Sequence, residues 1–455
     1  MRRLVVRSAV IAVSLVGLVA GVGGQGRPGP AKSQAFSMAL TGDSIITRRI
    51  ANRTESGFLK LVDLVRGADA AFTNLEMLFH DYEPYPMNES GGTYMRAEPA
   101  LVDDIVWFGF DMVSRANNHT GDYGALGMRL TTRYVAKAGL VQAGVGESLT
   151  EAREARFFDA PGGRVALVSV ASTFPDHARA SRSRGDMPAR PGLNPLRFST
   201  IYVVTRDQLE QLRSTVRALG LAAPAQGRAL TAFRARFEVG DAPAVRTEAN
   251  ADDMAEIAAV VNNASRLADY TVVSIHGHEG GRNRAVPADF LVTFARAMVD
   301  AGADIVAGHG PHVIRGIELY KGKAIFYSLG DFIFENDTVL RLPEENYERY
   351  DLGPDKHVAD FADARSGSGQ RGFVADREIW EGILAMPRWS GHALADITLY
   401  PVTLGFGQPL GLRGRPQLAE GELAQKILDD VAKRSAPFGT TVTVSDGVGR
   451  IVPAR

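Results

Sequence analysis

The sequence predicts an α/β fold, in which helices pack against layers of β-sheet. Short apolar segments rich in β-branched and aromatic residues alternate with stretches of helical periodicity along most of the chain. Apolar residues make up 45% and charged residues 23% of the 455 residues, which is close to the globular average and excludes a disordered chain. Length alone would suggest about three domains, but the regular alternation favours one large core with insertions.

The expected elements follow from this periodicity, in chain order. The strands are Phe36–Leu40, Ala70–Thr73, Met112–Ser114, Val165–Ala171, Thr271–Ile275, Asp304–Ala307 and Ala324–Ser328. The helices are Phe58–Arg66, Pro99–Phe108, Leu126–Ala138, Ala251–Ala268 and Ala288–Ala301. The last helix is bounded by Pro287 before it and Gly302 after it, which are typical start and stop signals. A strand, a helix and a strand are expected at Asp396–Leu404, Leu418–Lys433 and Thr440–Val452.

Two polar stretches interrupt the pattern. Asp176–Pro195 is rich in Arg, Pro and Ser, and Asn336–Glu378 has few periodic apolar positions. Both are predicted to be long surface loops, a class that is more often functional or mobile than neutral. We therefore expect a loop-rich insertion at residues 336–395 and a C-terminal part, residues 396–455, that completes the core.

The N-terminus has the pattern of an export signal. Met1-Arg2-Arg3 is followed by an apolar run and then by a Gly/Pro-rich stretch that ends near Pro30. The uninterrupted run from Ser8 to Gly24 reaches about 17 residues, the lower limit of a spanning helix. Residues 1–27 are thus expected to be a cleaved signal or an N-terminal anchor. The rest of the chain would be extracytoplasmic (periplasmic, secreted or anchored), with membrane contact only through residues 1–24.

Polar residues follow directly after six of the expected strands. They are Thr41-Gly42-Asp43, Asn74-Leu75-Glu76, Arg115–Asp122, His276–Glu279, Gly308–His312 and Leu329–Asp331. In open α/β sheets ligands bind beyond the carboxyl ends of the strands, so these segments are expected to converge. Their Asp, Glu, Asn and His side chains are ligands for Zn, Mn or Fe. The sequence therefore predicts a metal site at the strand ends.

The counts of Cys and His narrow the chemistry of such a site. No Cys is present, which excludes disulfide scaffolds, zinc ribbons, iron–sulfur clusters and Cys nucleophiles. Five of the nine His fall in three of the motifs, whereas His80, His177, His357 and His392 are expected to be surface or loop residues. The formal charge of −1 excludes a strongly basic nucleic-acid binder.

In order and spacing, the motifs resemble those of the CapA/PgsA family of capsule or poly-γ-glutamate synthesis proteins, within the calcineurin-like metallophosphoesterase superfamily. The resemblance covers residues 35–335. It implies a four-layer α/β/β/α sandwich with surface-loop insertions and a dinuclear metal site. By match to the superfamily, the metal ligands would be Asp43, Glu76 as the bridging carboxylate, Asn118, His276, His309 and His312. His119, positioned by Asp122 or a carbonyl, would lie near the leaving group as general acid or charge stabiliser.

The sequence departs from the superfamily pattern at four places. Glu76 is a methylene longer than the usual Asp, and Asp331 stands where Asn is more common. Ile45 stands where a metal-binding His is usual, so the first metal loses a ligand. Gly277 follows His276, and an additional His278 and Glu279 come next. Either His278 or Glu279 replaces the missing ligand, or a single metal binds. The expected cofactor is one or two divalent ions of Mn, Fe or Zn.

The leading functional hypothesis is a metal-dependent phosphoester hydrolase in capsule or poly-γ-glutamate biosynthesis. Its substrate would be phosphorylated or polyanionic, and it would work with a synthesis complex and without nucleic acid. One alternative is a non-catalytic anchored component that binds or exports the polymer, and another is a metal-dependent amidohydrolase of γ-glutamyl bonds. No Gly-x-x-x-x-Gly-Lys-[Ser/Thr] loop occurs in the sequence, so the chain is not itself an ATP-driven ligase of that type.

Overall fold

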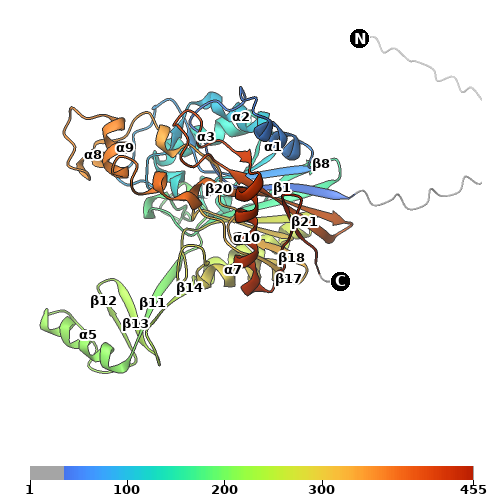
Figure 1. Ribbon diagram of the computed structural model, residues 1–455. Coiled ribbons are helices and arrows are strands. Elements are labelled where there is room, and N and C mark those ends of the chain that lie inside the picture. Colours follow the sequence, from blue (N-terminus) through green and yellow to red (C-terminus); the bar gives the residue numbers. More distant parts are fainter. Residues whose placement is uncertain (1–34, 454–455) are drawn as a thin grey trace, which may run out of the picture. The chain divides into compact units, whose positions relative to one another are not determined.

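Two β-sheets lie face to face in the computed structural model, which describes residues 35–453 (Figure 1). The expected export signal or anchor, residues 1–27, lies outside the described residues. Among residues 35–453, no helix combines the length and apolar character needed to cross a bilayer.

The first sheet has ten strands in the order β23-β24-β21-β20-β1-β2-β5-β6, with β19 beside β1 and β22 beside β21. Its strands are β1 (Phe36–Ile45), β2 (Ala70–Leu75), β5 (Met112–Ser114), β6 (Val141–Ala143), β19 (Asp331–Phe334), β20 (Glu381–Ser390), β21 (Ala393–Thr403), β22 (Gln417–Leu418), β23 (Thr443–Ser445) and β24 (Val448–Ile451). β1, β2, β5 and β6 are parallel neighbours, whereas β20 runs antiparallel to β1.

The second sheet has six strands in the order β17-β18-β16-β15-β9-β8. They are β8 (Arg156–Ala160), β9 (Gly163–Ala171), β15 (Tyr270–His276), β16 (Ile305–His309), β17 (Ile317–Tyr320) and β18 (Lys323–Phe326). The central strands β9, β15, β16 and β18 are parallel. Their carboxyl ends, and those of β1 and β2, form the edge at which the polar motifs lie.

Helices cover the outer face of each sheet. The first sheet carries α1 (Ser56–Arg66), α2 (Val102–Phe108) and α3 (Gly124–Lys137), and the second carries α6 (Ala251–Ser265) and α7 (Asp289–Asp300). Alternate residues of one strand serve different layers: Met38 and Leu40 point into the core between the sheets, whereas Ala39 packs toward the helices. α10 (Gly421–Ser435) packs against the inner core through Ile427. The predicted four-layer α/β/β/α fold is confirmed.

The expected loop-rich range 336–395 contains the strand β20, which the sequence pattern did not predict. β20 pairs along its length with β21, and Arg388 forms an ion pair with Asp396 at 2.7 Å on the solvent side. Pro387 and Arg388 break the apolar run, yet Ile383, Ala385 and Trp389 still face the inner core at a two-residue period. The segment between the main strands therefore ends near residue 380. It holds two short helices, α8 (Glu344–Glu348) and α9 (Val358–Ser366).

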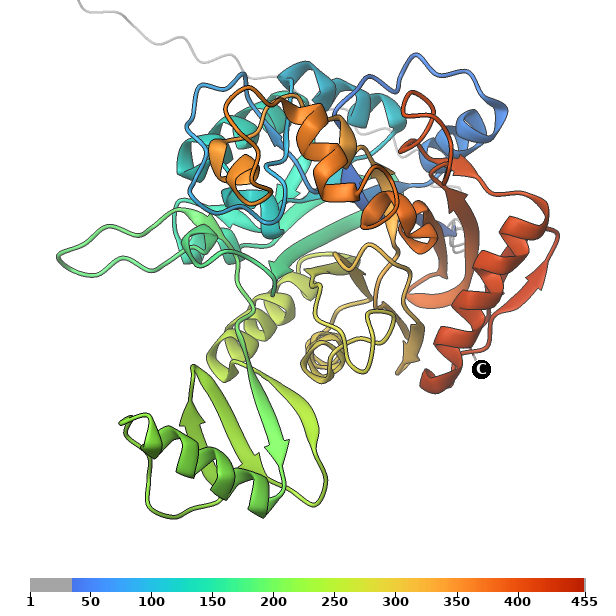
Figure 2. The ribbon, with the colours of Figure 1, turned by 60° about the vertical axis from the view of Figure 1, so that its left-hand side comes forward.

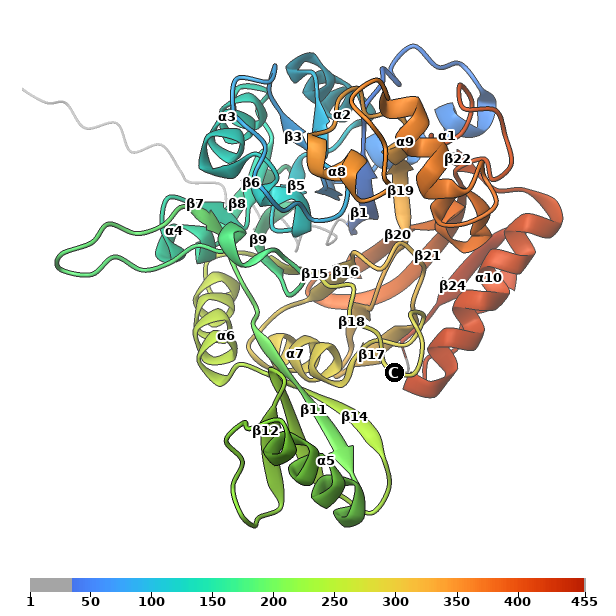
Figure 3. The same cartoon turned by 90° about the vertical axis from the view of Figure 1, so that its left-hand side faces the viewer.

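A small four-stranded sheet at residues 198–249 was not expected from the sequence. Its strands are β11 (Phe198–Val204), β12 (Ala229–Ala232), β13 (Ala235–Val239) and β14 (Ala244–Ala249), in the order β12-β13-β11-β14. α5 (Arg206–Ala218) packs on it through a separate apolar cluster that includes Leu209 and Val216. Figures 2 and 3 show this sheet standing apart from the two main sheets. Half-exposed strands carry few continuous apolar residues, so apolar periodicity does not predict these four strands.

The remaining elements are short. They are β3 (Leu78–Phe79), β4 (Arg96–Ala97), β7 (Val145–Gly146), β10 (Gly192–Leu193) and α4 (Leu149–Arg153), with single 3₁₀ turns between them. The expected loop Asp176–Pro195 contains one such turn and β10, which pairs with β7.

Candidate metal centre

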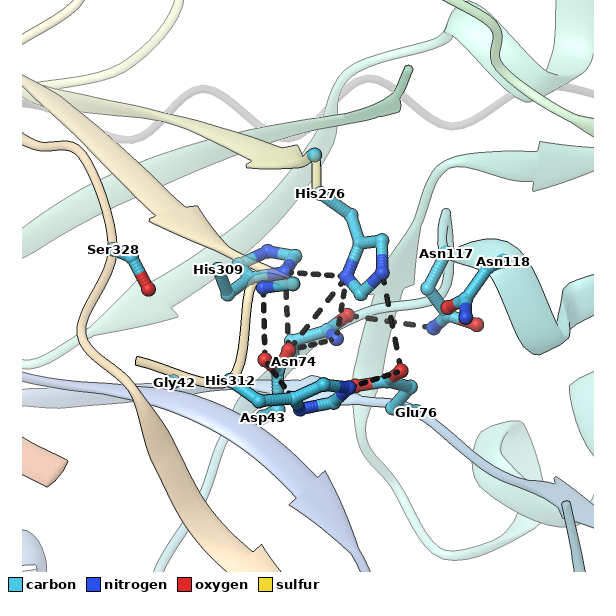
Figure 4. Close-up of polar contacts among 12 residues, drawn as sticks. Gly42, Asp43, Asn74, Glu76, Asn117, Asn118, His276, His309, His312 and Ser328 are labelled. Carbon is cyan, nitrogen blue, oxygen red and sulfur yellow. Dashed lines mark hydrogen bonds and ion pairs between the residues drawn. The ribbon is translucent and has the colours of Figure 1, made fainter. Parts of the chain in front are cut away.

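The strand register brings the polar motifs to one place. Asp43 on β1 is aligned with Asn74 on β2 and with Asp331 on β19, whereas His276 on β15 is aligned with His309 on β16. Figure 4 shows the side chains of Asp43, Asn74, His276 and His309 pointing toward one another from the two sheets. The expected convergence of the strand-end motifs is therefore present in the structure, and the cluster is almost fully buried.

Close backbone approach explains the glycine before Asp43. A Cβ atom at Gly42 would lie 1.7 Å from the carbonyl oxygen of Gly330, so no other residue fits here without moving the backbone. The Asp43 amide donates to that same Gly330 carbonyl at 3.1 Å. The contact holds β1 and the turn before β19 together directly beneath the site.

Asp43 is the central carboxylate of the cluster. Its Oδ1 accepts from Asn74 Nδ2 at 2.7 Å, and its Oδ2 accepts from the Gly310 amide at 2.8 Å. Oδ1 also lies 3.6 Å from His276 Nδ1 and 3.4 Å from His309 Nδ1. Although burial raises the pKa of Asp43, the hydrogen bonds and charges of these two histidines hold it well below its usual value. Asp43 is therefore held as an anion.

Glu76 has the opposite environment. Both of its carboxylate oxygens are buried and have no hydrogen-bond partner among the described residues. Its Oε1 instead lies 3.7 to 4.0 Å from a nitrogen of each of three histidines, His119, His276 and His312. Burial, and then the negative charge of Asp43, raise the pKa of Glu76 well above its usual value. An unpartnered buried carboxylate is costly unless a cation compensates it.

Neighbouring side chains orient three of the histidines. His309 Nε2 lies 2.7 Å from Ser274 Oγ, His312 Nδ1 lies 2.8 Å from Asp331 Oδ1, and His119 Nδ1 lies 2.7 Å from Asp122 Oδ2. In each case the other ring nitrogen faces the cluster. Metal-binding histidines are commonly fixed in this way through their second nitrogen.

The loop that carries His312 has a conformation that side chains rarely adopt. His312 has φ of 55°, in the left-handed region, and its ring packs against the rings of Phe334 and Phe373, with centroids 5.4 and 5.7 Å away. Burial lowers the pKa of His312, but the Asp331 and Asp43 carboxylates together raise it by more, so the net shift is upward. Strain of this kind persists where the surroundings fix the residue, and it is concentrated at functional sites.

Three overlapping groups of donor atoms could hold a metal ion. They are Asp43 with His276 and His309, Glu76 with His276 and His278, and Asp43 with Glu76 and His312, and within each group the donor atoms lie within 4.8 Å of one another. Imidazole and carboxylate donors suit Zn, Mn and Fe. Among the described residues, the two buried oxygens of Glu76 have no partner, so a compensating positive charge is missing there, and a metal ion would supply it. The residues therefore fit a divalent metal.

The extra residues after His276 have different surroundings. His278 Nε2 lies 3.1 Å from His276 Nε2, and burial lowers the pKa of His278 well below its usual value and that of His276 to about 4. Both rings are thus held neutral, as metal ligands require. Glu279 instead accepts hydrogen bonds from Ser172 and Thr173 at 2.7 Å each and belongs to none of the three donor groups.

Asn118 lies at the rim of the cluster. Its Nδ2 donates to the Gly91 carbonyl at 2.9 Å, whereas its Oδ1 is buried without a partner among the described residues. Ile45, at the position of the usual histidine, is fully buried in the outer core.

Sequence reasoning did not assign a site role to three residues that hold the ligands in place. Asn74 binds Asp43, Ser274 binds His309 and Asp331 binds His312. Asn74 and Asp331 stood in the strand-end motifs, but Ser274 lies inside an apolar strand without a local signal. His80, expected at the surface or in a loop, is fully buried beside Tyr123, and burial lowers its pKa to about 4.

Comparisons with known proteins place the chain in a family. A family model described as Bacterial capsule synthesis protein PGA_cap matches residues 37–336. The Sinorhizobium fredii protein y4sH is 38% identical over 434 residues, covering 91% of this chain and 93% of that protein. The PGA biosynthesis protein CapA of Bacillus subtilis is 26% identical over 359 residues, covering 73% of this chain and 75% of that protein. The capsule biosynthesis protein CapA of Bacillus anthracis is 26% identical over 311 residues, 67% of this chain and 61% of that protein. The chain therefore belongs to the PGA_cap family of bacterial capsule synthesis proteins.

Proposed function

We propose that this chain is a metal-dependent phosphoester hydrolase that serves capsule or poly-γ-glutamate biosynthesis, together with other proteins of that synthesis. The observation that carries the proposal is the environment of Glu76: both of its buried oxygens are without a hydrogen-bond partner among residues 35–453, and its Oε1 faces three histidines. Next to it stands a His–Asp pair of the kind that transfers protons. The names of the relatives support the biosynthetic setting.

The donor groups around Asp43, Glu76, His276, His309 and His312 would hold the metal. When bound, a divalent metal lowers the pKa of water and stabilises the charge that develops on phosphoryl oxygens. Ser274 and Asp331 keep His309 and His312 facing the centre.

His119 is placed to donate a proton to the leaving oxygen. Its Nδ1 is held by Asp122, while its Nε2 points toward Glu76 Oε1, 3.7 Å away. Asp122 also accepts from the backbone amides of Gly91 and Met95 at 2.9 and 2.8 Å, which fix the carboxylate in place. With Nδ1 held by Asp122, the ring directs Nε2 toward the centre, which is the orientation that a proton donor to the leaving oxygen needs.

Metal analysis and one variant test this proposal. The purified full chain is expected to contain about one or two Mn, Fe or Zn ions and to hydrolyse bis(4-nitrophenyl) phosphate. His119→Ala should lower kcat by about 10²- to 10⁴-fold, since it removes the proton donor, while the metal content stays unchanged. His392→Ala is the matched control, because His392 is exposed and remote from the motifs.

Two results would contradict the proposal. One is a folded protein that binds no metal when Mn²⁺, Fe²⁺ or Zn²⁺ is supplied. The other is full hydrolysis by His119→Ala, which would place the activity elsewhere. A γ-glutamyl 4-nitroanilide measured alongside separates phosphoester from amide hydrolysis. A metal-loaded chain that cleaves neither would favour the non-catalytic, polymer-binding alternative.

We also propose that the chain acts outside the cytoplasmic membrane. The support is the sequence of residues 1–27, with its basic start and apolar run. Protease added to spheroplasts should digest the protein while a cytoplasmic marker survives. Protection until the cells are lysed would contradict this location.

A further inference from the structure

A large cavity adjoins the metal centre. It has a volume of about 870 Å³ and lies between β19 and the segment that carries α9, which Figure 3 shows beside β19. Its walls are largely apolar and include Val339, Phe361, Val374 and Trp380. This volume and lining are typical of small-molecule sites.

Two aromatic rings separate the cavity from the metal centre. Phe334 and Phe373 line the cavity, and both rings pack against the imidazole of His312. His312 in turn belongs to one of the three donor groups. A ligand in the cavity would therefore be one aromatic layer away from the metal ligands.

Arg365 supplies a positive charge at this boundary. Its guanidinium lies over Phe373 at 5.0 Å from the ring centroid and donates to Thr93 Oγ1. Arg48 and Arg413, which also line the cavity, are paired with Glu335 and Asp337. Within residues 35–453, no carboxylate forms an ion pair with Arg365, and its Nε and Nη2 have no protein acceptor. A half-buried guanidinium without a counter-ion is suited to bind an anionic oxygen.

Thr93 connects this charge to the proton-donating pair. It follows Gly91 and Gly92, and a Cβ atom at Gly92 would lie 3.9 Å from His119 Cε1. Gly91 contacts both Asn118 and Asp122 through its backbone. Arg365 therefore lies on the His119 side of the centre, where the leaving group is expected.

We propose that the cavity binds the apolar part of a phosphoester, with Arg365 holding a phosphate oxygen at the entrance to the metal centre. This inference rests on the proposed function and names its substrate class: a phosphate ester of an alkyl or aryl alcohol. The walls between the arginines of this cavity are apolar, so a hydrocarbon chain gains by leaving water there, whereas a polymer with a charge on every residue would have to bury charged groups against apolar side chains. The two parts of the site thus fit an amphiphilic phosphate.

Binding of phosphonates to the metal-loaded full chain tests the assignment by calorimetry, without any need for hydrolysis. Each buried methylene favours binding by about fourfold, so octylphosphonate should bind at least about tenfold more tightly than ethylphosphonate. Val374→Trp fills the cavity and should remove the preference for octylphosphonate. Ala375→Trp, at the exposed neighbouring position outside the lining, should keep the preference.

The role of the Arg365 charge is tested with a second pair of variants. Arg365→Gln should weaken binding of both phosphonates by about tenfold or more, whereas Arg377→Gln, at an exposed arginine outside the cavity lining, should weaken it less than twofold. Octanoate should bind at least tenfold more weakly than octylphosphonate.

The outcomes separate this inference from the proposed function. Equal binding of octyl- and ethylphosphonate, or an octyl preference that survives Val374→Trp, would overturn the cavity assignment even if bis(4-nitrophenyl) phosphate is hydrolysed. Octanoate binding as tight as that of octylphosphonate would overturn the phosphate assignment. An octyl preference in a chain without hydrolase activity would support the cavity assignment and contradict the catalytic proposal alone.

Discussion

At the residue scale, the site consists of polar side chains that interrupt buried strands. Asp43, Glu76, His276, His309 and His312 could be predicted because their types are unusual at the end of an apolar run. Ser274 could not be predicted, since a serine within a strand is ordinary and its bond to His309 spans 35 residues of sequence. The candidate ligands are thus marked locally in the sequence, whereas the residues that orient them depend on the tertiary fold.

The His119–Asp122 pair leads to a prediction about catalysis. Asp122→Asn keeps the size of the side chain but removes the carboxylate that holds His119 Nδ1. We expect kcat for bis(4-nitrophenyl) phosphate to fall by about 10- to 100-fold, with metal content unchanged. Steady-state kinetics across pH, with metal analysis of the same samples, measures both quantities.

The control for this variant is Asp186→Asn, an exposed aspartate in the surface loop. It should leave kcat unchanged. If Asp122→Asn loses metal in proportion to activity, Asp122 supports the metal rather than the proton donor, and the assigned role is wrong.

At the element scale, the strands that end in the site were predictable and several others were not. β1, β15 and β16 extend through Asp43, His276 and His309, beyond the predicted apolar runs. Pro387 interrupts the apolar alternation of β20, and the strands β11 to β14 have exposed, charged faces, so their sequences do not show a strand pattern. Periodicity detects an element only where one face is continuously apolar, and edge or half-exposed strands do not satisfy this condition.

The start of α6 gives a prediction about stability and pH. Asp253, which is buried, accepts hydrogen bonds from Arg197 and Arg153, and Arg197 binds both of its oxygens. Burial raises the pKa of Asp253, but the Arg197 side chain and backbone and then Arg153 lower it by more, to below the usual 3.8. Asp253→Asn should therefore lower the free energy of unfolding by about 2 kcal/mol at pH 7.

The sign of the pH dependence follows from the lowered pKa. The stabilisation by ionised Asp253 is complete above the unfolded-state pKa. It is lost as the pH falls through that value and on through the folded-state pKa. Urea unfolding at pH 7 and at pH 3 should show a smaller difference between wild type and Asp253→Asn at pH 3. Asp252→Asn, on the exposed side of the same turn, is the control, and a difference that grows on acidification would contradict the assignment.

At the scale of the whole molecule, two sheets and their helices position the centre, and the small sheet at residues 198–249 does not contribute to it. None of the donor groups found among the described residues includes a residue from 198–249. The layered architecture was predictable because the alternation of strands and helices is global. The insertion was not, because its own core is small and rests on a few residues such as Leu209 and Leu230.

The pairing of β11 with β14 predicts that this sheet can be removed. Thr200 lies opposite Thr247, so residues 201–246 can be replaced by an Asn-Gly turn. Phe198 would still stack on Phe290 at 4.4 Å, and Thr247 would still accept from the Phe290 amide. We expect the metal content to stay unchanged and the Tm, measured by circular dichroism, to shift by only a few degrees.

A longer excision, which replaces residues 198–249, is the comparison. It also removes the contacts to Phe290 and should lower the Tm further. Loss of metal or of folding in the shorter excision would show that the small sheet supports the centre.

The two ring nitrogens of His276 limit how metal ions can occupy the centre. Its Nδ1 faces Asp43 and His309, and its Nε2 faces His278 and Glu76. A neutral imidazole offers a lone pair on one nitrogen only, so His276 can serve one of its two donor groups at a time. Ions at those two positions would therefore compete for a shared ligand, so that occupancy of one would weaken the affinity of the other. A metal titration of such a centre would show negative cooperativity.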